Sequence, residues 1–174
     1  MAMKDERIGR SKVKALEYDR NYSGWAQSVL AALQEEYGIG NKETLKAFSS
    51  LAGGVARQGE TCGAIIGAMA ALNLVIGREA IQDSQTYQTA MIKAIELHSQ
   101  FKEELKKQFG FTDEVKNSTC RYIQERIYGR GFIMTDPRER EAFEAVGGHS
   151  EKGCPKVCAV AAEVVARQLS EILW

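Results

Sequence analysis

The chain has 174 residues, a length that suits one domain with a hydrophobic core of its own. Its 23 Lys and Arg residues balance 23 Asp and Glu residues, so it lacks the excess of positive charge that a general binder of nucleic acids or anionic membranes requires. Apolar residues at 44% and charged residues at 26% are typical of a globular protein and exclude intrinsic disorder.

The first residues are charged and contain no apolar run, so they do not have the pattern of a secretory signal sequence. We expect residues 1–12 to be a flexible N-terminal extension and residues 13–18 to open the fold. The longest apolar stretch, residues 64–76, is shorter than the about 20 residues that a membrane-spanning helix requires. We therefore expect a cytoplasmic protein that does not insert into membranes.

Apolar residues recur at helical spacing along most of the chain, and glycines or helix-capping residues separate the repeats. The pattern predicts helices over residues 22–37, 43–51, 61–76, 83–109, 114–128, 136–146 and 154–174. Asn41 and Asp113 have the character of N-caps, and Pro155 suits a first helical turn. Because no segment alternates like a β-strand and no linker divides the chain, we predict one all-α domain over residues 1–174. It is an irregular helical bundle around the Gly/Ala-rich central helix 61–76.

Glycines recur every four residues around the start of the central helix, at Gly59, Gly63 and Gly67. A glycine inside a helix costs about 1 kcal/mol relative to alanine, which indicates that this face requires space. Two interpretations are open. Either a neighbouring helix packs closely here, or a cofactor or a second cysteine-bearing segment occupies the face, in which case Gly63 and Gly67 are cofactor-binding residues.

Four cysteines stand at positions that suit a shared thiol site. Cys62 and Cys154 fall at the starts of predicted helices, where unpaired N–H groups and the helix macrodipole stabilise a thiolate and lower its pKa. Cys158 follows Cys154 by one turn on the same face, and Cys120 lies within the helix predicted over residues 114–128. In the cytoplasm such thiols are reactive, redox-cycling or metal-bound, or they are small buried hydrophobic residues.

The glycine turn and the first of these cysteines form the pattern Gly-Gly-x-x-x-x-Gly-Glu-Thr-Cys-Gly-Ala-x-x-Gly over residues 53–67. With Cys120 and the later Cys-Pro-Lys-Val at residues 154–157, the pattern resembles the C_GCAxxG_C_C family over residues 22–173. The resemblance implies a helical domain with four characteristic cysteines, from which the family's redox activity is mainly inferred. A related domain precedes the haem part of split-Soret cytochromes, which brings an iron–sulfur cluster into consideration.

The chain departs from the family at the first of the four cysteines. Trp25 stands at that position, at the start of Trp-Ala-Gln-Ser-Val-Leu, whereas Cys62, Cys120 and Cys154 match family positions and Cys158 is additional. Either three cysteines suffice, or Cys158 supplies the fourth sulfur, or the site has decayed and Trp25 fills its space.

Three functions agree with these observations. In the first, Cys62 attacks or transfers electrons and a second thiol, Cys154 or Cys120, resolves a disulfide with an unidentified redox partner. In the second, Cys62, Cys120, Cys154 and Cys158 bind an iron–sulfur cluster or another soft metal without catalysis. In the third, the chain is a non-catalytic helical module. We favour the redox function, and we expect Cys62, Cys120 and Cys154 to lie close together with Cys158 as an extra member.

The two histidines give weaker signals. His149 precedes Cys154 by five residues and is within reach of the same site, whereas His98 is interpreted as a helix-face residue near the core.

The last predicted helix is apolar on more than one face, which together with the zero net charge predicts a homodimer. The residues concerned are Val157, Val160, Ala161, Val164, Val165, Leu169 and Ile172.

Overall fold

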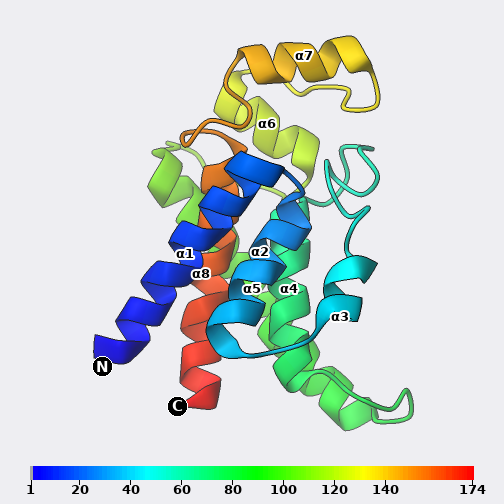
Figure 1. Cartoon of the computed structure of the whole chain (residues 1–174), viewed down its shortest axis with the longest axis vertical. Coiled ribbons are helices and arrows are strands. Elements are labelled where there is room, and N and C mark those ends of the chain that lie inside the picture. The colour runs from blue at the N-terminus through cyan, green and yellow to red at the C-terminus, as the bar shows by residue number, and fades with distance from the viewer. Residues whose placement is uncertain (1) are drawn as a thin grey trace.

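The computed structural model describes residues 2–174, and over that range it contains eight α-helices in one domain (Figure 1). They are α1 (Ala2–Tyr22), α2 (Trp25–Tyr37), α3 (Lys42–Ala47), α4 (Gly63–Ile76), α5 (Ser84–Phe109), α6 (Cys120–Tyr128), α7 (Pro137–Ala145) and α8 (Cys154–Leu173). The described residues form no β-strand, and their only extended pairing is one antiparallel bridge between Thr61 and Thr119. The predicted all-α class is confirmed. No helix in the described range is both long enough and apolar enough to cross a membrane.

Helix α8 lies at the centre of the bundle, where α1, α2, α4 and α5 all pack against it. Figure 1 shows α1 and α2 beside it, with α6 and α7 across the end at which α8 begins. The Gly/Ala-rich helix α4 packs on α2, α5 and α8 and is the second well-covered helix. The apolar residues that suggested a homodimer are mostly buried by helices of the same chain: Val157, Val160, Ala161, Val164, Val165 and Leu169. Their burial within one chain accounts for the pattern and leaves the homodimer without support.

The N-terminal segment differs from the expected flexible extension. Residues 2–22 form one continuous helix that packs along α8 and α2. Its fully buried stripe consists of Ser11, Ala15 and Asp19, which recur every four residues and therefore share one face. Because these side chains are small or polar, hydrophobic periodicity does not detect the buried face, although their size allows α1 to approach its neighbours closely.

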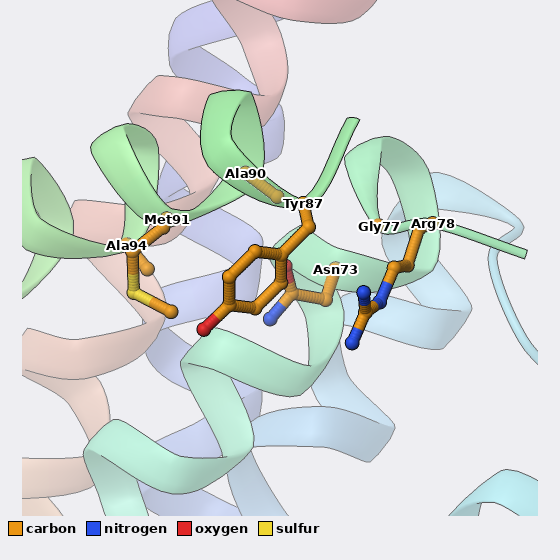
Figure 2. Close-up of a pocket in the computed structure, with 7 residues that line it drawn as sticks. All are labelled: Asn73, Gly77, Arg78, Tyr87, Ala90, Met91 and Ala94. Carbon is orange, nitrogen blue, oxygen red and sulfur yellow. The ribbon is translucent and has the colours of Figure 1, made fainter. Parts of the chain in front are cut away.

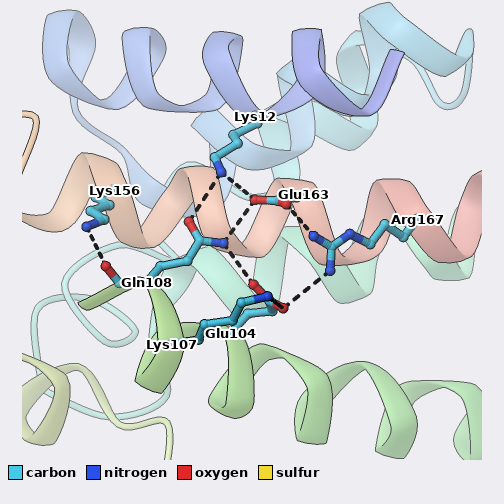
Figure 3. A network of polar contacts seen from close by, with 7 residues as sticks. All are labelled: Lys12, Glu104, Lys107, Gln108, Lys156, Glu163 and Arg167. Atoms are coloured by element: carbon cyan, nitrogen blue, oxygen red, sulfur yellow. Dashed lines mark hydrogen bonds and ion pairs between the residues drawn. The ribbon is translucent and has the colours of Figure 1, made fainter. Parts of the chain in front are cut away.

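A polar network ties α1 and α5 to α8 (Figure 3). Lys12 of α1 forms an ion pair with Glu163 of α8 at 2.6 Å. Gln108 of α5 donates from its amide to Glu163 and to Glu104, each at 3.0 Å. Arg167 pairs with both carboxylates. Because the side chains of Glu104 and Glu163 are mostly buried, this network is screened less than an exposed ion pair and fixes the three helices in register.

The glycine face of α4 packs against the start of α2. A Cβ atom on Gly63 would lie 2.5 Å from the carbonyl oxygen of Leu51 and 3.1 Å from the nitrogen of Ala26. On Gly67 it would overlap the carbonyl oxygen of Ala26. The space beside both glycines is thus filled by protein backbone, which favours close helix packing over the cofactor-binding role expected for Gly63 and Gly67.

Substitution of Gly67 tests this contact. Gly67→Ala should lower the free energy of unfolding by about 1–3 kcal/mol, because α4 has to move away from α2 to admit the methyl group. Urea unfolding followed by circular dichroism measures the change.

Gly9→Ala in α1 is the matched control, since a Cβ atom there meets nothing within 4 Å and alanine favours the helix by about 1 kcal/mol. A Gly67→Ala variant as stable as the wild type would contradict the close packing.

Candidate thiol site

Three of the four cysteines stand at the starts of helices. Cys62 is the N-cap residue of α4, and Cys120 and Cys154 are the first residues of α6 and α8. The positions of Cys62 and Cys154 agree with the sequence prediction. Cys120 differs, because it begins its helix instead of lying within it.

The start of α6 is set by capping residues that the sequence analysis passed over. The predicted helix over residues 114–128 with Asp113 as its cap is wrong in its first part. The side chain of Asn117 accepts a hydrogen bond from the N–H of Thr119 at 3.0 Å, and the hydroxyl of Thr119 accepts one from the N–H of Tyr122 at 3.4 Å. These two local bonds hold the chain in an extended form until Cys120 and start the helix there.

The antiparallel bridge brings the first two cysteines to one place. The N–H of Cys62 donates to the carbonyl of Ser118 at 2.8 Å, and the N–H of Cys120 donates to the carbonyl of Glu60 at 2.6 Å. Each cysteine is one residue beyond the paired threonines, and side chains alternate along extended chain, so both thiols lie on the same side of the bridge.

The start of α8 is held by Tyr128 of α6. The hydroxyl of Tyr128 accepts a hydrogen bond from the N–H of Cys154 at 3.0 Å, donates to the carbonyl of Gly148 at 3.1 Å, and lies 3.7 Å from the sulfur of Cys154. One turn along, the thiol of Cys158 lies 3.8 Å from the carbonyl oxygen of Trp25 at the start of α2. The start of α8 is thus tied to α6 and α2.

All four cysteines are buried free thiols, with 5% of Cys62, 8% of Cys120, 5% of Cys154 and none of Cys158 exposed. Burial raises the pKa of every one of them. Charge on Cys62 raises the pKa of each of the other three, and charge on Cys154 raises the pKa of Cys120 and Cys158, so Cys62 and Cys154 each interact electrostatically with the other three thiols.

The expected low pKa of Cys62 is wrong. Burial raises the pKa of this thiol to about 11, and the N–H groups of Ala64 and Ile65 in the first turn of α4 offset only part of that increase. At neutral pH the resting state of Cys62 is therefore the thiol. A thiolate has to be generated during a reaction, which requires a group that accepts the proton.

Asp19 is the residue of this site that the sequence analysis missed. Its side chain is fully buried near the end of α1, and its Oδ1 accepts a hydrogen bond from the N–H of Trp25 at 3.0 Å. Burial raises the pKa of Asp19 to about 7, and its charge raises the pKa of Cys62, Cys154 and Cys158. Its place six residues before the start of α2 is the one sequence signal that could have indicated an interaction with that helix.

Among residues 2–174, neither histidine forms a hydrogen bond with a cysteine. The ring of His149 lies between those of Trp25 and Phe143, each centroid 5.4 Å away, and burial lowers its pKa. His98 forms a 2.7 Å hydrogen bond with the hydroxyl of Ser118, which agrees with its interpretation as a helix-face residue. His149 thus packs beside Trp25, the residue at the start of α2.

The expected metal set receives no support from this geometry. In residues 2–174, no group of three or more His, Cys, Asp or Glu side chains is arranged to hold a metal ion. Cys62, Cys120, Cys154 and Cys158 therefore do not fit a preformed cluster site, and we derive no chemistry through one.

A surface pocket of about 290 Å³ lies between α4 and α5, at the far end of α4 from Cys62 (Figure 2). The guanidinium of Arg78 lies 4.5 Å from the centre of the Tyr87 ring at its edge. No cysteine lines this pocket, so it is separate from the thiol site.

The fold and the thiols together define an all-helical protein with a buried cysteine cluster at one end of its bundle. The sequence model described as "Putative redox-active protein (C_GCAxxG_C_C)" matches residues 25–168, and the chain belongs to this family. No curated protein and no solved structure matches the chain. Helix α1, with Asp19, precedes the matched range.

The loop that leads to Cys62 is strained. Val55, Ala56 and Arg57 have φ angles of 54°, 49° and 66°, in the left-handed region that side chains disfavour. Two backbone hydrogen bonds close the strained turn. The N–H of Gly59 donates to the carbonyl of Gly53 at 3.1 Å, and the N–H of Glu60 donates to the carbonyl of Gly54 at 3.0 Å. The turn leads directly into the bridged residue Thr61, which precedes Cys62.

Replacing the β-branched residue of this turn should relieve the strain. Val55→Gly should raise the free energy of unfolding by about 0.5–1 kcal/mol, because glycine adopts a positive φ without the penalty that valine incurs. Thermal and urea unfolding measure the effect. Val13→Gly, the same substitution on an exposed face of α1, should instead destabilise by about 1 kcal/mol. Equal destabilisation by the two variants would show that the turn carries no strain.

Proposed function

We propose that this chain is a thiol redox protein in which Cys62 and a second buried cysteine, Cys120 or Cys154, form and break a disulfide. Two thiols lose two electrons and two protons when the bond forms, and a disulfide R–S–S–R takes them up and leaves as two R–SH molecules. The observation that carries the proposal is the antiparallel bridge, which places the buried thiols of Cys62 and Cys120 on one side of the paired segments.

Cys62 is the attacking thiol in this proposal. It caps the N-terminus of α4, where the N–H groups of Ala64 and Ile65 favour its thiolate. Burial raises the pKa of Cys62 less than that of Cys154, so Cys62 is the easier of the two to ionise. Membership of a redox-active family agrees with this assignment.

The burial of the thiols favours a small reaction partner. Cys62, Cys120 and Cys154 expose between 5% and 8% of their surface, which leaves no room for the bulky disulfide of a folded protein to approach in line. A low-molecular-weight disulfide without charge meets the least resistance in such an apolar environment.

Titration with hydroxyethyl disulfide tests the proposal. The anaerobically reduced protein should present four free thiols in denaturant before the reaction and two after it, and dithiothreitol should restore all four. Mass spectrometry of the alkylated protein assigns the pair. Cys62→Ser should abolish the loss of thiols, because the proposal assigns the attacking sulfur to Cys62 at the N-terminus of α4.

Cys158→Ser is the matched control, because Cys158 is fully buried against the carbonyl of Trp25 and should not be needed for the disulfide. If all four wild-type thiols survive the reagent, the proposal is wrong and the non-catalytic module is supported. A visible absorption band in anaerobically purified protein, with thiols protected until the iron is removed, would likewise contradict it in favour of a cluster.

A further inference from the structure

Asp19 is a buried carboxyl group without an ionic partner. Its side chain has no exposed surface, and Oδ2 has no hydrogen-bond partner, while Oδ1 is held by the N–H of Trp25. No Lys or Arg within residues 2–174 forms an ion pair with it. A buried carboxylate in that state is costly, and a purely structural helix cap needs only the oxygen that Trp25 already occupies.

The groups around Asp19 come from three separate elements. The backbone of Trp25 links this carboxyl group to a thiol: its N–H donates to Oδ1 of Asp19 at 3.0 Å, and its carbonyl oxygen lies 3.8 Å from the sulfur of Cys158. In agreement, the charge of Asp19 raises the pKa of Cys62 at the start of α4, of Cys154 and Cys158 in α8, and of Tyr128 in α6. All four are acids that are neutral at pH 7, and no basic group is among them. The unpartnered oxygen of Asp19 is thus a proton acceptor of carboxylate type that interacts with three of the thiols.

We infer that Asp19 is the proton acceptor that activates the thiol cluster, supplied by a helix outside the range that matches the family. The inference rests on the proposed function. Asp19 takes the proton of Cys62 as the sulfur attacks R–S–S–R, which forms a mixed disulfide and releases R–S⁻. The proton then passes from Asp19 to that leaving group and gives R–SH.

The second half of the reaction repeats the transfer. Asp19 takes the proton of the second thiol, whose sulfur attacks the sulfur of Cys62 in the mixed disulfide. A second R–S⁻ leaves and receives this proton. The net change is two protein thiols and one R–S–S–R converted into one protein disulfide and two R–SH, with Asp19 ionised again at the end.

Two physical properties suit Asp19 to this role. Because burial raises its pKa to about 7, a large fraction is ionised at neutral pH, and the carboxylate is a stronger base than an exposed aspartate. The same negative charge raises the pKa of Cys62, Cys154 and Cys158 and therefore opposes their ionisation. Acceptance of the proton speeds the oxidation of the thiols, whereas the negative charge slows it. A substitution that removes both therefore shows which effect dominates the rate.

Asp19→Asn is the variant that distinguishes the roles. The amide retains an oxygen for the N–H of Trp25 but cannot accept a proton. If Asp19 acts only through its charge, its removal lowers the pKa of the thiols and oxidation becomes faster. If Asp19 accepts the proton, oxidation at neutral pH becomes slower, by roughly a hundredfold.

The experiment measures the rate of thiol loss in the reduced full-length chain with hydroxyethyl disulfide between about pH 5 and 9. The wild-type rate should increase with pH through about 7, as Asp19 loses its proton, and then level off. The Asp19→Asn rate should be low and lack this inflection, whereas Asp19→Glu should restore part of both. Asp83→Asn changes another aspartate whose side chain accepts a hydrogen bond from a helix N–H, at the start of α5, and should leave the profile unchanged.

A measurement on the wild type keeps the inference testable if Asp19→Asn does not fold, which circular dichroism would reveal. The infrared carbonyl band of a buried carboxylic acid should titrate with the same midpoint as the reaction rate. A rate without that inflection, or an Asp19→Asn variant that reacts as fast as the wild type or faster, overturns the role of Asp19. Absence of any wild-type oxidation instead overturns the proposed function.

Discussion

The pairing of residues 60–62 with residues 118–120 determines where the thiols of Cys62 and Cys120 lie. Two backbone hydrogen bonds join these segments, and they satisfy the N–H groups of Cys62 and Cys120 at the starts of α4 and α6. Elsewhere in the bundle, helices are placed mainly by side-chain packing, which tolerates small shifts. A backbone bridge is more exacting, because a slip by one residue would turn both thiols to the opposite side. The backbone strain of the left-handed turn before Cys62 is tolerated because the surrounding structure holds this register.

Burial, and not the helix N-terminus, controls the ionisation of the cluster. The increase of the Cys62 pKa from 9.0 to about 11 corresponds to roughly 3 kcal/mol in favour of the neutral thiol. A helix N-terminus contributes about 0.3–1 kcal/mol in the opposite direction. Sequence analysis recognises the helix start but not the depth of burial, and for this reason it assigned the wrong sign to the pKa of Cys62.

The parts of the fold that follow from the sequence are those in which one strong local signal acts alone. The cap at Asn41 and the glycine that ends α5 at Gly110 were predicted and are confirmed. Helix α1 was missed because its buried face contains Ser11 and Asp19 in place of large apolar residues. Asp19 escaped notice for the same reason: in a charged segment an aspartate has the character of a solvent-exposed residue, and only the tertiary contact with α2 and α8 buries it.

The backbone of Trp25, the residue that stands where the resemblance to the family places a first cysteine, takes part in the site. The N–H of Trp25 holds Asp19 at 3.0 Å, and its carbonyl oxygen lies 3.8 Å from the sulfur of Cys158. Neither contact depends on the side chain, whose ring packs against His149. The start of α2 therefore helps to hold Asp19 and Cys158 in place, while the indole fills space that a smaller side chain would leave open.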